Sequence, residues 1–553
     1  MPVLALAVAL ITVRVYWPCV RNSFTYWDDD LYLRVVEQHP RLTWSTLKWA
    51  FTETQPFYYH PLTWVSLVLD YQLWGQNPAG THAVSLLLHA LNAALVVALV
   101  WGLLNAVPTI SSNERRVLAV LVGVLFAVHP MQVESVAWYA ERKTVLCATF
   151  ALASLCAYVR YAQQDRRRRW WWAALGFGTA AMLAKPMAVS LPFAMLVADY
   201  YPLRRYGTDG WRRLVIEKLP LLLMSALLSV VTVVAQTIGG AVMELENLGL
   251  GARLLVAMRG VIFYLWKLVW PAWLSAYYPL GGKITLSQAE FWVPTAAFAV
   301  VTMLLVWGRR RVPALVAGWI AYLVWLLPVS GVLQSGAQAA ADRFAYLAIV
   351  PVLMLLAGGG LWLWRRMSPV GRFALTALIA GVLMFLSVRC RRQIGMWRNE
   401  ATLWTDVLAH FPGSGVANLH YAAELAAQRR FLEAVPHAQV VVEVFPHNGL
   451  GYSTLGLCWL KLGEPVRAIK ELRDALRWGP QLAAPRYNLA CAYARLGQFA
   501  QAYNALCELA RLDPHMLSLA ARDGEFTTLR ADPQYGQQLH QLLNSSAVKS
   551  GPP

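Results

Sequence analysis

The sequence predicts an all-α protein in two parts, a polytopic bundle of membrane helices followed by a solenoid of helical repeats. Apolar residues make up 58% of the 553-residue chain, and charged residues make up only 14%, against roughly 25% in soluble domains. Beyond residue 397 the long apolar stretches end and a 34-residue period begins. These observations exclude a soluble enzyme and a disordered scaffold.

Eleven apolar stretches approach the length of about 20 residues that a helix needs to cross a bilayer. Two of them, 170–184 and 187–203, form a hairpin that is broken at Lys185 and Pro186. A twelfth segment, 253–270, carries three cations along its helical surface, so we expect an interfacial or re-entrant helix there. The eleven expected spans lie near residues 3–20, 82–104, 117–130, 144–162, 170–184, 187–203, 219–238, 293–307, 313–332, 344–364 and 372–388.

The net charge of +18 lies almost wholly in the apolar part. Residues 1–397 hold 34 Lys/Arg and 17 Asp/Glu, whereas residues 398–553 hold 14 and 13. This distribution argues against nucleic-acid binding and for topology-setting charge, because arginine-rich short loops remain cytoplasmic. With eleven crossings and a cytoplasmic start, five arginine clusters fall on the cytoplasmic side, at 115–116, 166–169, 204–213, 309–311 and 365–366.

The same topology places three long or polar loops, 21–81, 239–292 and 333–343, on the outer face together with the repeats. We therefore expect a multi-pass protein of a bacterial inner membrane, with these loops and the repeats in the periplasm. An endoplasmic reticulum membrane with lumenal repeats is the alternative.

The C-terminal part repeats every 34 residues, as Pro412, Pro446, Pro480 and Pro514 do. Small residues in the second helix of each unit and a proline after it are typical of tetratricopeptide repeats. We expect a membrane domain at 1–397, a repeat domain at 398–543 and a disordered tail at 544–553. Within the repeat domain we expect three repeats over about 418–519, a half-repeat at 399–412 and a cap at 521–541.

The strongest candidate for chemistry is the run Asp28, Asp29 and Asp30, which directly follows the first span. Adjacent carboxylates repel one another, so at least one should have a raised pKa unless a cation compensates. The run is either a solvated acidic loop or helix N-cap, or a general base at the membrane surface.

Other polar residues gather on the same expected face, and each also has a plain structural reading. Lys185 sits at a turn near the outer interface, where it either snorkels or meets a lipid phosphate. Arg343, after Asp342, is either part of a structural pair or a bidentate phosphate ligand. The remaining candidates, in loops or at helix ends where packing or ion pairs are the alternative, are His60, Glu134, Glu141, Arg142, Lys143 and Tyr278.

Several motifs do not occur in the sequence. There is no G-x-x-x-x-G-K-[ST] phosphate loop, no HExxH and no G-x-S-x-G, so ATP-driven transport, zinc proteolysis and hydrolase chemistry are unsupported. The seven cysteines form no CxxC pair, so no metal or disulfide framework is readable. We expect no required cofactor or metal, although an acidic run leaves Mg²⁺ or Mn²⁺ open.

An ordered set of stretches gives the chain a family resemblance. The set comprises FTYWDDDLYL, HPLTWVSLVLDYQLWGQNPAGTHAVSLLLHALN, FAVHPMQVESVAWYAERK, LAKPMAVSLPFAMLVADYYPL, EKLPLLL and LPVSGVLQSGAQAAADRFAYL, followed by the repeats. In this order the chain resembles the transmembrane and tetratricopeptide repeat-containing O-mannosyltransferases, of the C-type glycosyltransferase superfamily, and in particular their bacterial relatives.

The resemblance implies an enzyme that takes a sugar, such as mannose, from a polyprenyl-phosphate donor and passes it to a hydroxyl of a translocated protein. It also implies that the first outer loop carries the active-site acid, which corresponds to Asp28 and Asp29 here. We favour Asp29 as the base and Asp28 next. Arg343, Lys185, Arg142 and Lys143 are then the candidate ligands of the leaving phosphate, with His60, Glu134, Asp342 and Tyr278 lining the pocket.

Two other functions stay open at this point. The same catalysis with a glycan or lipid acceptor would leave the repeats an assembly role. A non-enzymatic scaffold would display the repeats to envelope proteins, but it would not need carboxylates and cations gathered on one face. In the enzyme reading, the repeat groove holds the acceptor polypeptide.

Overall fold

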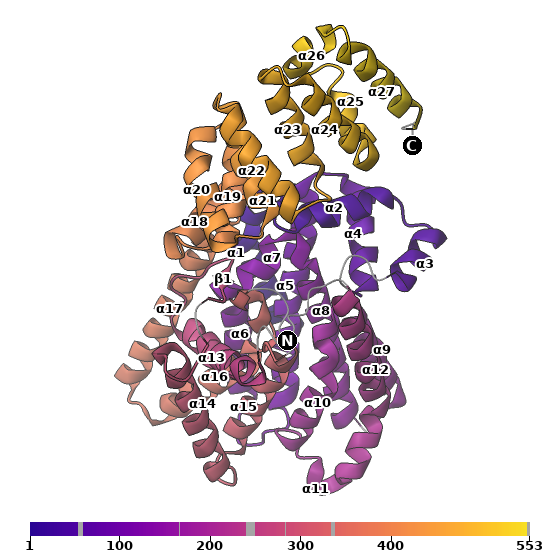
Figure 1. Ribbon diagram of the computed structural model, residues 1–553. Coiled ribbons are helices and arrows are strands. Elements are labelled where there is room, and N and C mark those ends of the chain that lie inside the picture. Colours follow the sequence, from indigo (N-terminus) through magenta and orange to yellow (C-terminus); the bar gives the residue numbers. More distant parts are fainter. Residues whose placement is uncertain (54–58, 165, 239–248, 282–283, 333–337, 550–553) are drawn as a thin grey trace. The chain divides into compact units, whose positions relative to one another are not determined.

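The computed structural model describes residues 1–53, 59–164, 166–238, 249–281, 284–332 and 338–549. It divides the chain into two compact units, Met1–Thr402 and Leu403–Pro553. Parts of the three expected outer loops and the end of the expected tail lie outside the described residues. In the described part almost every element is a helix (Figure 1), so the predicted all-α class is confirmed.

The first unit contains α1 to α17 and one short pair of strands. Its elements are α1 (Pro2–Tyr16), α2 (Asp29–Gln38), α3 (Trp44–Thr52), α4 (Pro61–Trp74), α5 (Pro78–Leu104), α6 (Ser112–Val128), α7 (Val133–Ala137), α8 (Arg142–Gln163), α9 (Arg168–Ala184), α10 (Leu191–Tyr200), α11 (Tyr206–Asp209), α12 (Trp211–Ile238), α13 (Leu250–Val269), β1 (Tyr278–Pro279), α14 (Ala289–Gly308), α15 (Pro313–Leu326), β2 (Gln338–Ala340), α16 (Ile349–Arg366) and α17 (Pro369–Met396).

Seven helical stretches in the described residues are long and apolar enough to cross a membrane. They are Pro2–Arg21, Pro78–Leu104, Tyr139–Gln163, Trp211–Ile238, Ala289–Gly308, Ile349–Arg366 and Pro369–Met396. An eighth span requires α6 and α7 together, which are bent by 57° at the break before Pro130, because the residue before a proline avoids helical geometry. The chain is thus a multi-pass membrane protein.

The expected number of eleven spans is higher than these seven to eight. All eleven expected stretches are helical, but three give helices below the required length. Pro186–Tyr200 and Pro313–Val329 are apolar yet short, and α9 has 17 residues. For α9 and Pro186–Tyr200 the physical reason is the break at Lys185 and Pro186, where Lys185 is extended and divides one long apolar region into two short arms.

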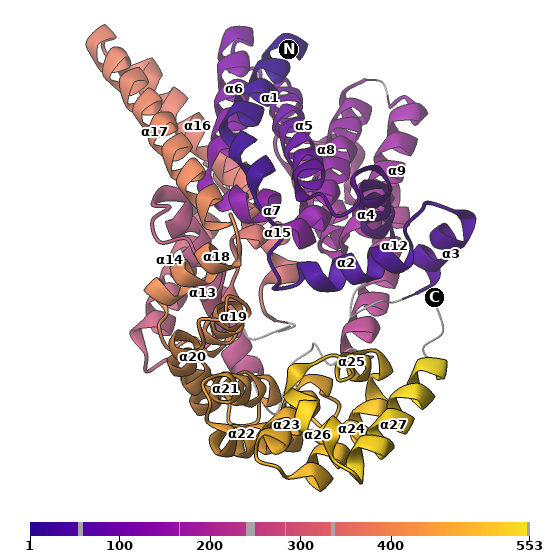
Figure 2. The same cartoon turned by 90° about the horizontal axis from the view of Figure 1, so that it is seen from above.

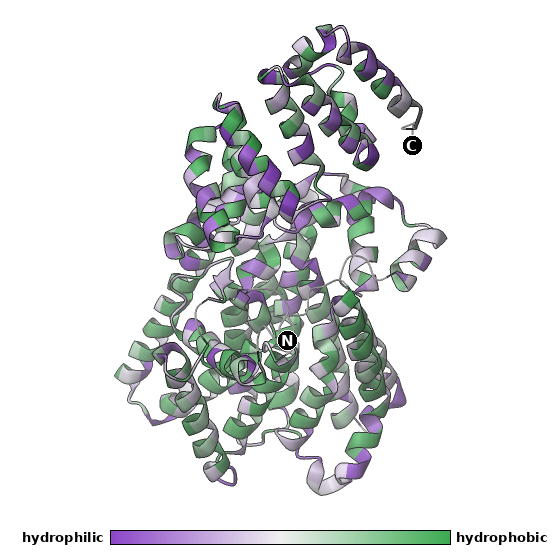
Figure 3. Ribbon diagram, viewed as in Figure 1, coloured by the Kyte–Doolittle hydropathy of each residue, from purple (hydrophilic) through white to green (hydrophobic). Residues whose placement is uncertain are grey.

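The bundle is built around three helices, α1, α5 and α6, which lie side by side in both views (Figures 1 and 2). Gly123 of α6 permits this approach, since a β-carbon there would lie 2.4 Å from Val97 of α5. α8 packs between α5 and α9. The helices of this unit are hydrophobic along most of their length (Figure 3), as expected for contact with lipid.

The segment predicted at 253–270 is helical as α13, and it is not among the seven spanning stretches. It buries Arg253 and Lys267, and the Lys267 ammonium donates to the carbonyls of Ala272 and Trp273 at 2.7 and 3.0 Å. Whether α13 is re-entrant stays a prediction. After α13, β1 pairs antiparallel with β2, which brings Tyr278 opposite Ala340 and close to Asp342.

The second unit is a series of helix pairs of nearly constant length. Its helices, starting with one that begins in the first unit, are α18 (Glu400–His410), α19 (Gly415–Ala427), α20 (Phe431–Val444), α21 (Gly449–Lys461), α22 (Pro465–Trp478), α23 (Ala483–Arg495), α24 (Phe499–Leu512), α25 (Pro514–Leu519), α26 (Thr527–Ala531) and α27 (Tyr535–Lys549).

The sequence period corresponds to a period of helix pairs, since α19, α21 and α23 begin 34 residues apart, as do α20, α22 and α24. Ala434, Ala468 and Ala502 are fully buried, which lets the helices of each pair pack closely. The assignment to the tetratricopeptide class stays a prediction. The expected disordered tail is wrong in part, because α27 continues to Lys549.

Candidate active site

Three cations converge on one buried carboxylate, that of Glu141. The Lys185 ammonium lies 3.0 Å from Oε2, the Lys143 ammonium 3.3 Å from Oε1, and the Arg343 Nε 3.4 Å from Oε1. Arg343 also pairs with Glu134, which accepts from the guanidinium and, at 2.8 Å, from the Arg343 backbone N–H. We call these five residues (Glu134, Glu141, Lys143, Lys185 and Arg343) the cation cluster.

Interruptions of helical structure bring these side chains together. Trp138 is extended and separates α7 from the turn Tyr139–Glu141. Glu134 and Glu141 are seven residues apart, but because of this interruption they do not share one face of a continuous helix. They meet instead because both reach Arg343, which lies in the turn Asp342–Ala345 before α16. Lys185 is likewise extended, as expected before a proline.

Charge and burial in the cation cluster favour binding of an anion. Three cations face two carboxylates, which leaves one positive charge in excess. Burial works against the charge of Arg343, yet Glu134, Glu141 and Asp28 raise its pKa above the ordinary value, so the guanidinium stays charged. Burial lowers the pKa of Lys185, while the carboxylate of Glu141 opposes that shift. Among the described residues, no group of acidic, histidine and cysteine side chains has the arrangement of a metal site.

The three aspartates of the acidic run have three different environments. Asp30 pairs with the exposed guanidinium of Arg34 at 2.6 Å. Asp29 is 1% exposed and accepts hydrogen bonds from the Thr25 N–H at 2.8 Å, the Thr25 hydroxyl at 3.2 Å and the Ala140 N–H at 3.1 Å. Asp28 is half-buried before α2, and its charge acts on Arg343. Only Asp28 and Asp29 therefore belong to the site.

Burial raises the pKa of Asp29 from 3.8 to about 7, although its hydrogen bonds from Thr25 and Ala140 favour the ionised form. At this position the loss of solvation destabilises the ionised carboxylate by more than these hydrogen bonds stabilise it. Asp29 thus titrates near neutral pH, and it ties the acidic run to the Tyr139–Glu141 turn of the cation cluster through Ala140.

Tyr278 and Asp342 form one edge of the site. The Tyr278 hydroxyl donates to Asp342 at 3.0 Å and accepts from the Ser275 N–H at 2.9 Å. Burial, reinforced by the charge of Glu134, raises the pKa of Asp342 well above its ordinary value. The surroundings of Asp342 therefore disfavour a negative charge on this carboxyl group beside Arg343.

His60 lies beside the lysines of the cluster. Its ring is parallel to that of Tyr32 at 5.9 Å, and the Tyr32 hydroxyl accepts from the Lys143 ammonium at 3.0 Å. Burial, with the charges of Lys143 and Lys185, lowers the pKa of His60 well below its ordinary value, so the imidazole is neutral. His60 caps α4, and the next turn fixes this helix to the Lys185 region through a 2.8 Å bond from Thr63 to the Ala184 carbonyl.

Arg142 does not join the cluster, in contrast to the expectation that it binds phosphate. Its guanidinium pairs with Asp70 at 2.7 Å and donates to Ser85, Ser66 and the Thr81 carbonyl. Arg142 and Lys143 are neighbours at the start of α8, and successive helical residues point about 100° apart. Arg142 therefore fixes α8 to α4 and α5, while Lys143 faces the site.

A stack of indole rings flanks the site. Trp27 stacks on Trp138 at 4.6 Å, and Trp138 stacks on Trp397 at 5.5 Å. The Arg343 guanidinium lies over the Trp138 ring at 5.2 Å, where a cation–π interaction stabilises it. Because Trp27 directly precedes Asp28, this stack links the position of the acidic run to that of Arg343.

The sequence pointed to most of this site but not to its centre. The sequence indicates Glu141 as a candidate, but it does not predict that the cations gather around this residue. Nothing in the sequence indicates that Thr144 and Tyr32 belong to the site. The Thr144 hydroxyl contacts Lys185 at 2.6 Å, and the Tyr32 hydroxyl contacts Lys143. What could have indicated Glu141 is its place in the sequence: it directly precedes two cations, Arg142 and Lys143, at the end of a loop.

Comparison with family models gives no match. The chain is 25% identical over 413 residues to human protein O-mannosyl-transferase TMTC4, which covers 66% of this chain and 54% of that protein. It is 22% identical over 442 residues to human protein O-mannosyl-transferase TMTC1, covering 72% of this chain and 49% of that protein. The predicted resemblance is confirmed, and the chain spans about half the length of these curated relatives.

A solved structure also aligns with most of the chain. It is the crystal structure of ArnT from Cupriavidus metallidurans bound to undecaprenyl phosphate, at 15% identity and a TM-score of 0.37, covering 96% of this chain and 88% of that one. The low TM-score means that the two folds agree only loosely.

Proposed function

We propose that this chain, a relative of the protein O-mannosyl-transferases, is a membrane glycosyltransferase that moves a sugar from a polyprenyl-phosphate donor to a hydroxyl of a protein. The observation that carries the proposal is the cation cluster. Three buried or half-buried cations share Glu141, and two carboxylates of the acidic run lie beside them: Asp29 accepts from the Ala140 N–H, and the charge of Asp28 acts on Arg343. Fixed cations at the position of a leaving phosphate stabilise the charge that develops on it.

In the proposed reaction the acceptor oxygen attacks the anomeric carbon of the sugar, and an aspartate takes the hydroxyl proton. The bond from the anomeric carbon to the phosphate oxygen breaks, and the electron pair leaves with the polyprenyl phosphate. One displacement inverts the anomeric centre. Lys143, Lys185 and Arg343 hold the phosphate in this scheme, and Tyr278 and His60 line the pocket beside it.

The environments of the two aspartates support a different order from the one that the sequence favoured. Asp29 is almost fully buried and receives three hydrogen bonds, so an acceptor has little access to it. Asp28 is more accessible and lies within the electrostatic influence of Arg343. We therefore assign the proton-accepting role to Asp28 and a positioning role to Asp29, which fixes the run to Ala140.

The test is transfer of labelled sugar from polyprenyl-phosphate donors, mannose among them, to peptide acceptors by the full chain in membranes. Asp28→Asn should reduce transfer by roughly a hundredfold or more, because general bases typically contribute 10² to 10⁴. Asp30→Asn is the matched control and should keep wild-type activity. If the wild type transfers no sugar from any such donor, the proposal is wrong; if Asp28→Asn is fully active, only the base is misassigned.

The acceptor class needs its own comparison. Peptides rich in Ser and Thr, oligosaccharides and lipid hydroxyls should be offered to the same preparation, and we expect transfer to the peptides. A chain ending at Thr402, where the first unit ends, should still modify a short peptide and lose activity on a folded protein if the repeats recruit acceptors. Transfer only to an oligosaccharide would replace the protein acceptor by a glycan.

The orientation is part of the proposal. The arginine-rich turns should face the cytoplasm and the cation cluster the periplasm or, in a eukaryotic cell, the lumen of the endoplasmic reticulum. A reporter fused after Asn544 should be active only on that outer side. A cytoplasmic signal would reverse the orientation.

A further inference from the structure

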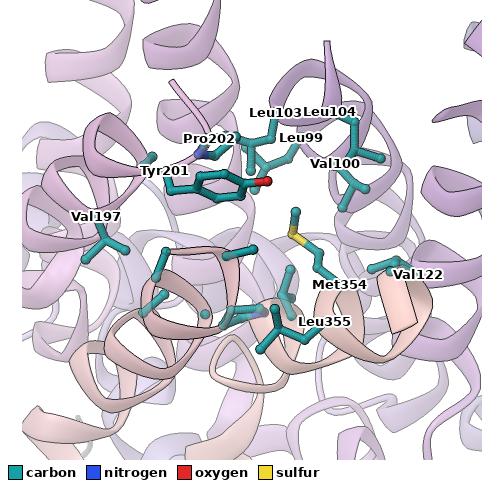
Figure 4. A pocket seen from close by; sticks show the side chains of 18 of the residues that line it. Leu99, Val100, Leu103, Leu104, Val122, Val197, Tyr201, Pro202, Met354 and Leu355 are labelled. Atoms are coloured by element: carbon teal, nitrogen blue, oxygen red, sulfur yellow. The ribbon is translucent and has the colours of Figure 1, made fainter. Parts of the chain in front are cut away.

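The membrane unit contains an apolar cavity of about 360 Å³ between α5, α6, α8, α10, α15 and α16. Side chains from these helices point into one common space (Figure 4), among them Leu103, Val197, Tyr201, Met354 and Leu355. None of the described residues that line it carries a charge. Tyr201 and Trp325 contribute isolated polar groups to an otherwise apolar lining, so a cavity of this kind takes up hydrocarbon in preference to water.

The walls of the cavity continue the elements that carry the cation cluster. Lys143 is in the first turn of α8, and Leu152 of the same helix lines the cavity. Lys185 directly precedes the segment that leads into α10, where Ala194 lines it. Each lysine is nine residues from the lining residue, and on α8 this separation is about 14 Å.

Arg343 has the same relation to α16. Its turn is followed by Leu347 and Val350, and both residues line the cavity. The cavity then follows α16 as far as Gly359, nine residues beyond Val350 and thus about 14 Å further along the helix. The three cations therefore stand at one end of the elements whose later turns enclose the apolar space.

Glycines keep part of this space open. Gly358 and Gly359 line the cavity, and a β-carbon at either position would meet no atom within 4 Å. Gly360 has equally open surroundings but does not line the cavity. Larger side chains at 358 and 359 can therefore enter the cavity without a backbone clash, and residue 360 provides a matched control in the same helix.

We propose that this cavity binds the distal isoprenoid units of the donor, while the cation cluster binds its phosphate. The inference rests on the proposed function and adds that the enzyme selects the length of the lipid chain. A hydrocarbon chain that starts at the cations and follows α8, α10 and α16 passes from one end of the bundle towards the other, through a core about 30 Å thick. Only a long polyprenyl chain reaches the far end of the cavity, at Gly358 and Gly359.

The kinetic test compares two mannosyl phosphate donors, one with a geranyl and one with an undecaprenyl chain. In the wild type the undecaprenyl donor should have a KM at least tenfold lower, since it buries many more methylene and methyl groups than the geranyl donor. Gly358→Leu and Gly359→Leu should raise the KM of the undecaprenyl donor roughly tenfold, with kcat and the geranyl KM unchanged. Gly360→Leu should leave both donors unaffected.

Equal KM values for the two donors in the wild type would overturn the inference and leave the glycosyltransferase proposal intact. An equal rise for both donors in Gly358→Leu would also overturn it, because the residue would then shape the reaction site and not the chain site. Absence of transfer from either donor contradicts the proposed function instead.

A binding measurement separates the donor chain from an ordinary membrane lipid. Undecaprenyl phosphate with a photoreactive group at its far end should crosslink to the lining residues of α15 and α16 in the full chain, and Gly358→Leu should reduce this labelling. Labelling confined to the outer surfaces of α14 or α17 would overturn the inference. So would a phospholipid acyl chain that stays crosslinked in the cavity when undecaprenyl phosphate is in excess.

Discussion

The membrane unit contains two buried ion networks with opposite signs at their centres. In the cation cluster, one carboxylate, Glu141, is shared by three cations. At the far end of α10, one guanidinium, that of Arg205, is shared by three carboxylates: Asp199 at 3.3 Å, Asp209 at 2.9 Å and Glu217 at 3.0 Å. We call this second group, together with Lys218 and Tyr158, the arginine hub.

The difference between the two networks concerns the balance of buried charge. In the arginine hub the buried cations Arg205 and Lys218 face three carboxylates, and Arg205 also donates to the Tyr158 hydroxyl at 2.7 Å. In the cation cluster three cations face two carboxylates. A network whose buried carboxylates outnumber its buried cations holds helices together, whereas one with an excess of cations around a shared anion can accept a second anion.

The largest expected effect separates the two networks by stability. Arg205→Met removes the centre of the arginine hub and leaves three buried or half-buried carboxylates without it. Loss of one partner from a buried ion pair costs about 3–5 kcal/mol, so the melting temperature in detergent should fall sharply. Sugar transfer per folded molecule should stay near the wild-type level. Unchanged stability would show that the arginine hub does not hold its helices together.

Lys185→Met is the converse experiment in the cation cluster. Glu141 keeps Lys143 and Arg343 as partners, so the melting temperature should change little. Loss of one donor to the leaving phosphate should reduce transfer roughly a hundredfold, as removal of a single preorganised donor does in other enzymes. Lys185→Arg, which keeps the charge, should recover part of the activity. If Lys185→Met is instead much less stable but keeps normal transfer per folded molecule, the cation cluster has a structural role like that of the arginine hub.

The pH dependence of stability should come from the cation-cluster side, through Asp29. Its pKa is raised from 3.8 to about 7 in the folded protein, so the folded state binds the proton more tightly than the unfolded state. The resulting stabilisation is complete below pH 3.8 and is lost as the pH rises towards 7. Between pH 5 and 8 the loss should be roughly 2.5 kcal/mol.

Thermal unfolding of Asp29→Asn gives the control for this effect. The amide does not titrate, so the fall in melting temperature between pH 5 and 8 should be much smaller than in the wild type. An identical pH profile in the variant would mean that another group is responsible.

The smallest effect is expected for the surface pair of Asp30 and Arg34, which is close to the site in sequence but not part of it. Asp30 and Arg34 form an exposed ion pair one helical turn apart, and such pairs contribute about 0.5 kcal/mol or less. Arg34→Ala should change neither transfer nor the melting temperature measurably. A large loss of transfer would place Asp30 in the reaction and contradict the separation of the acidic run into site and surface.

Much of this architecture was predictable because period and composition are local properties of a sequence. The 34-residue spacing of Pro412, Pro446, Pro480 and Pro514 gave the helix pairs of the second unit. The choice between neighbours was not predictable, because it depends on helical phase and on distant partners. Arg142 and Lys143 are adjacent cations that the sequence does not distinguish, yet Arg142 pairs with Asp70 and Lys143 pairs with Glu141.

The triplet Asp28, Asp29 and Asp30 shows the same limit. The sequence identified the acidic run, but not which carboxylate is buried, because the hydrogen bond from Ala140 arrives from 111 residues away. The span count failed for a related reason. Apolar composition shows where helices form, but breaks such as Lys185–Pro186 decide how long they become.

The pairing of Glu134 with Arg343 joins residues 209 positions apart in the chain. At a synthesis rate of about 10 residues per second, Glu134 and Glu141 emerge roughly 20 seconds before their arginine partner. During that interval a nascent chain carries two carboxylates near the edge of the membrane with only the lysines to neutralise them. Biogenesis should therefore include a stage in which the bundle is inserted but the site is open, and a ribosome-stalled chain that stops before Arg343 should expose that stage to insertases and quality-control proteases.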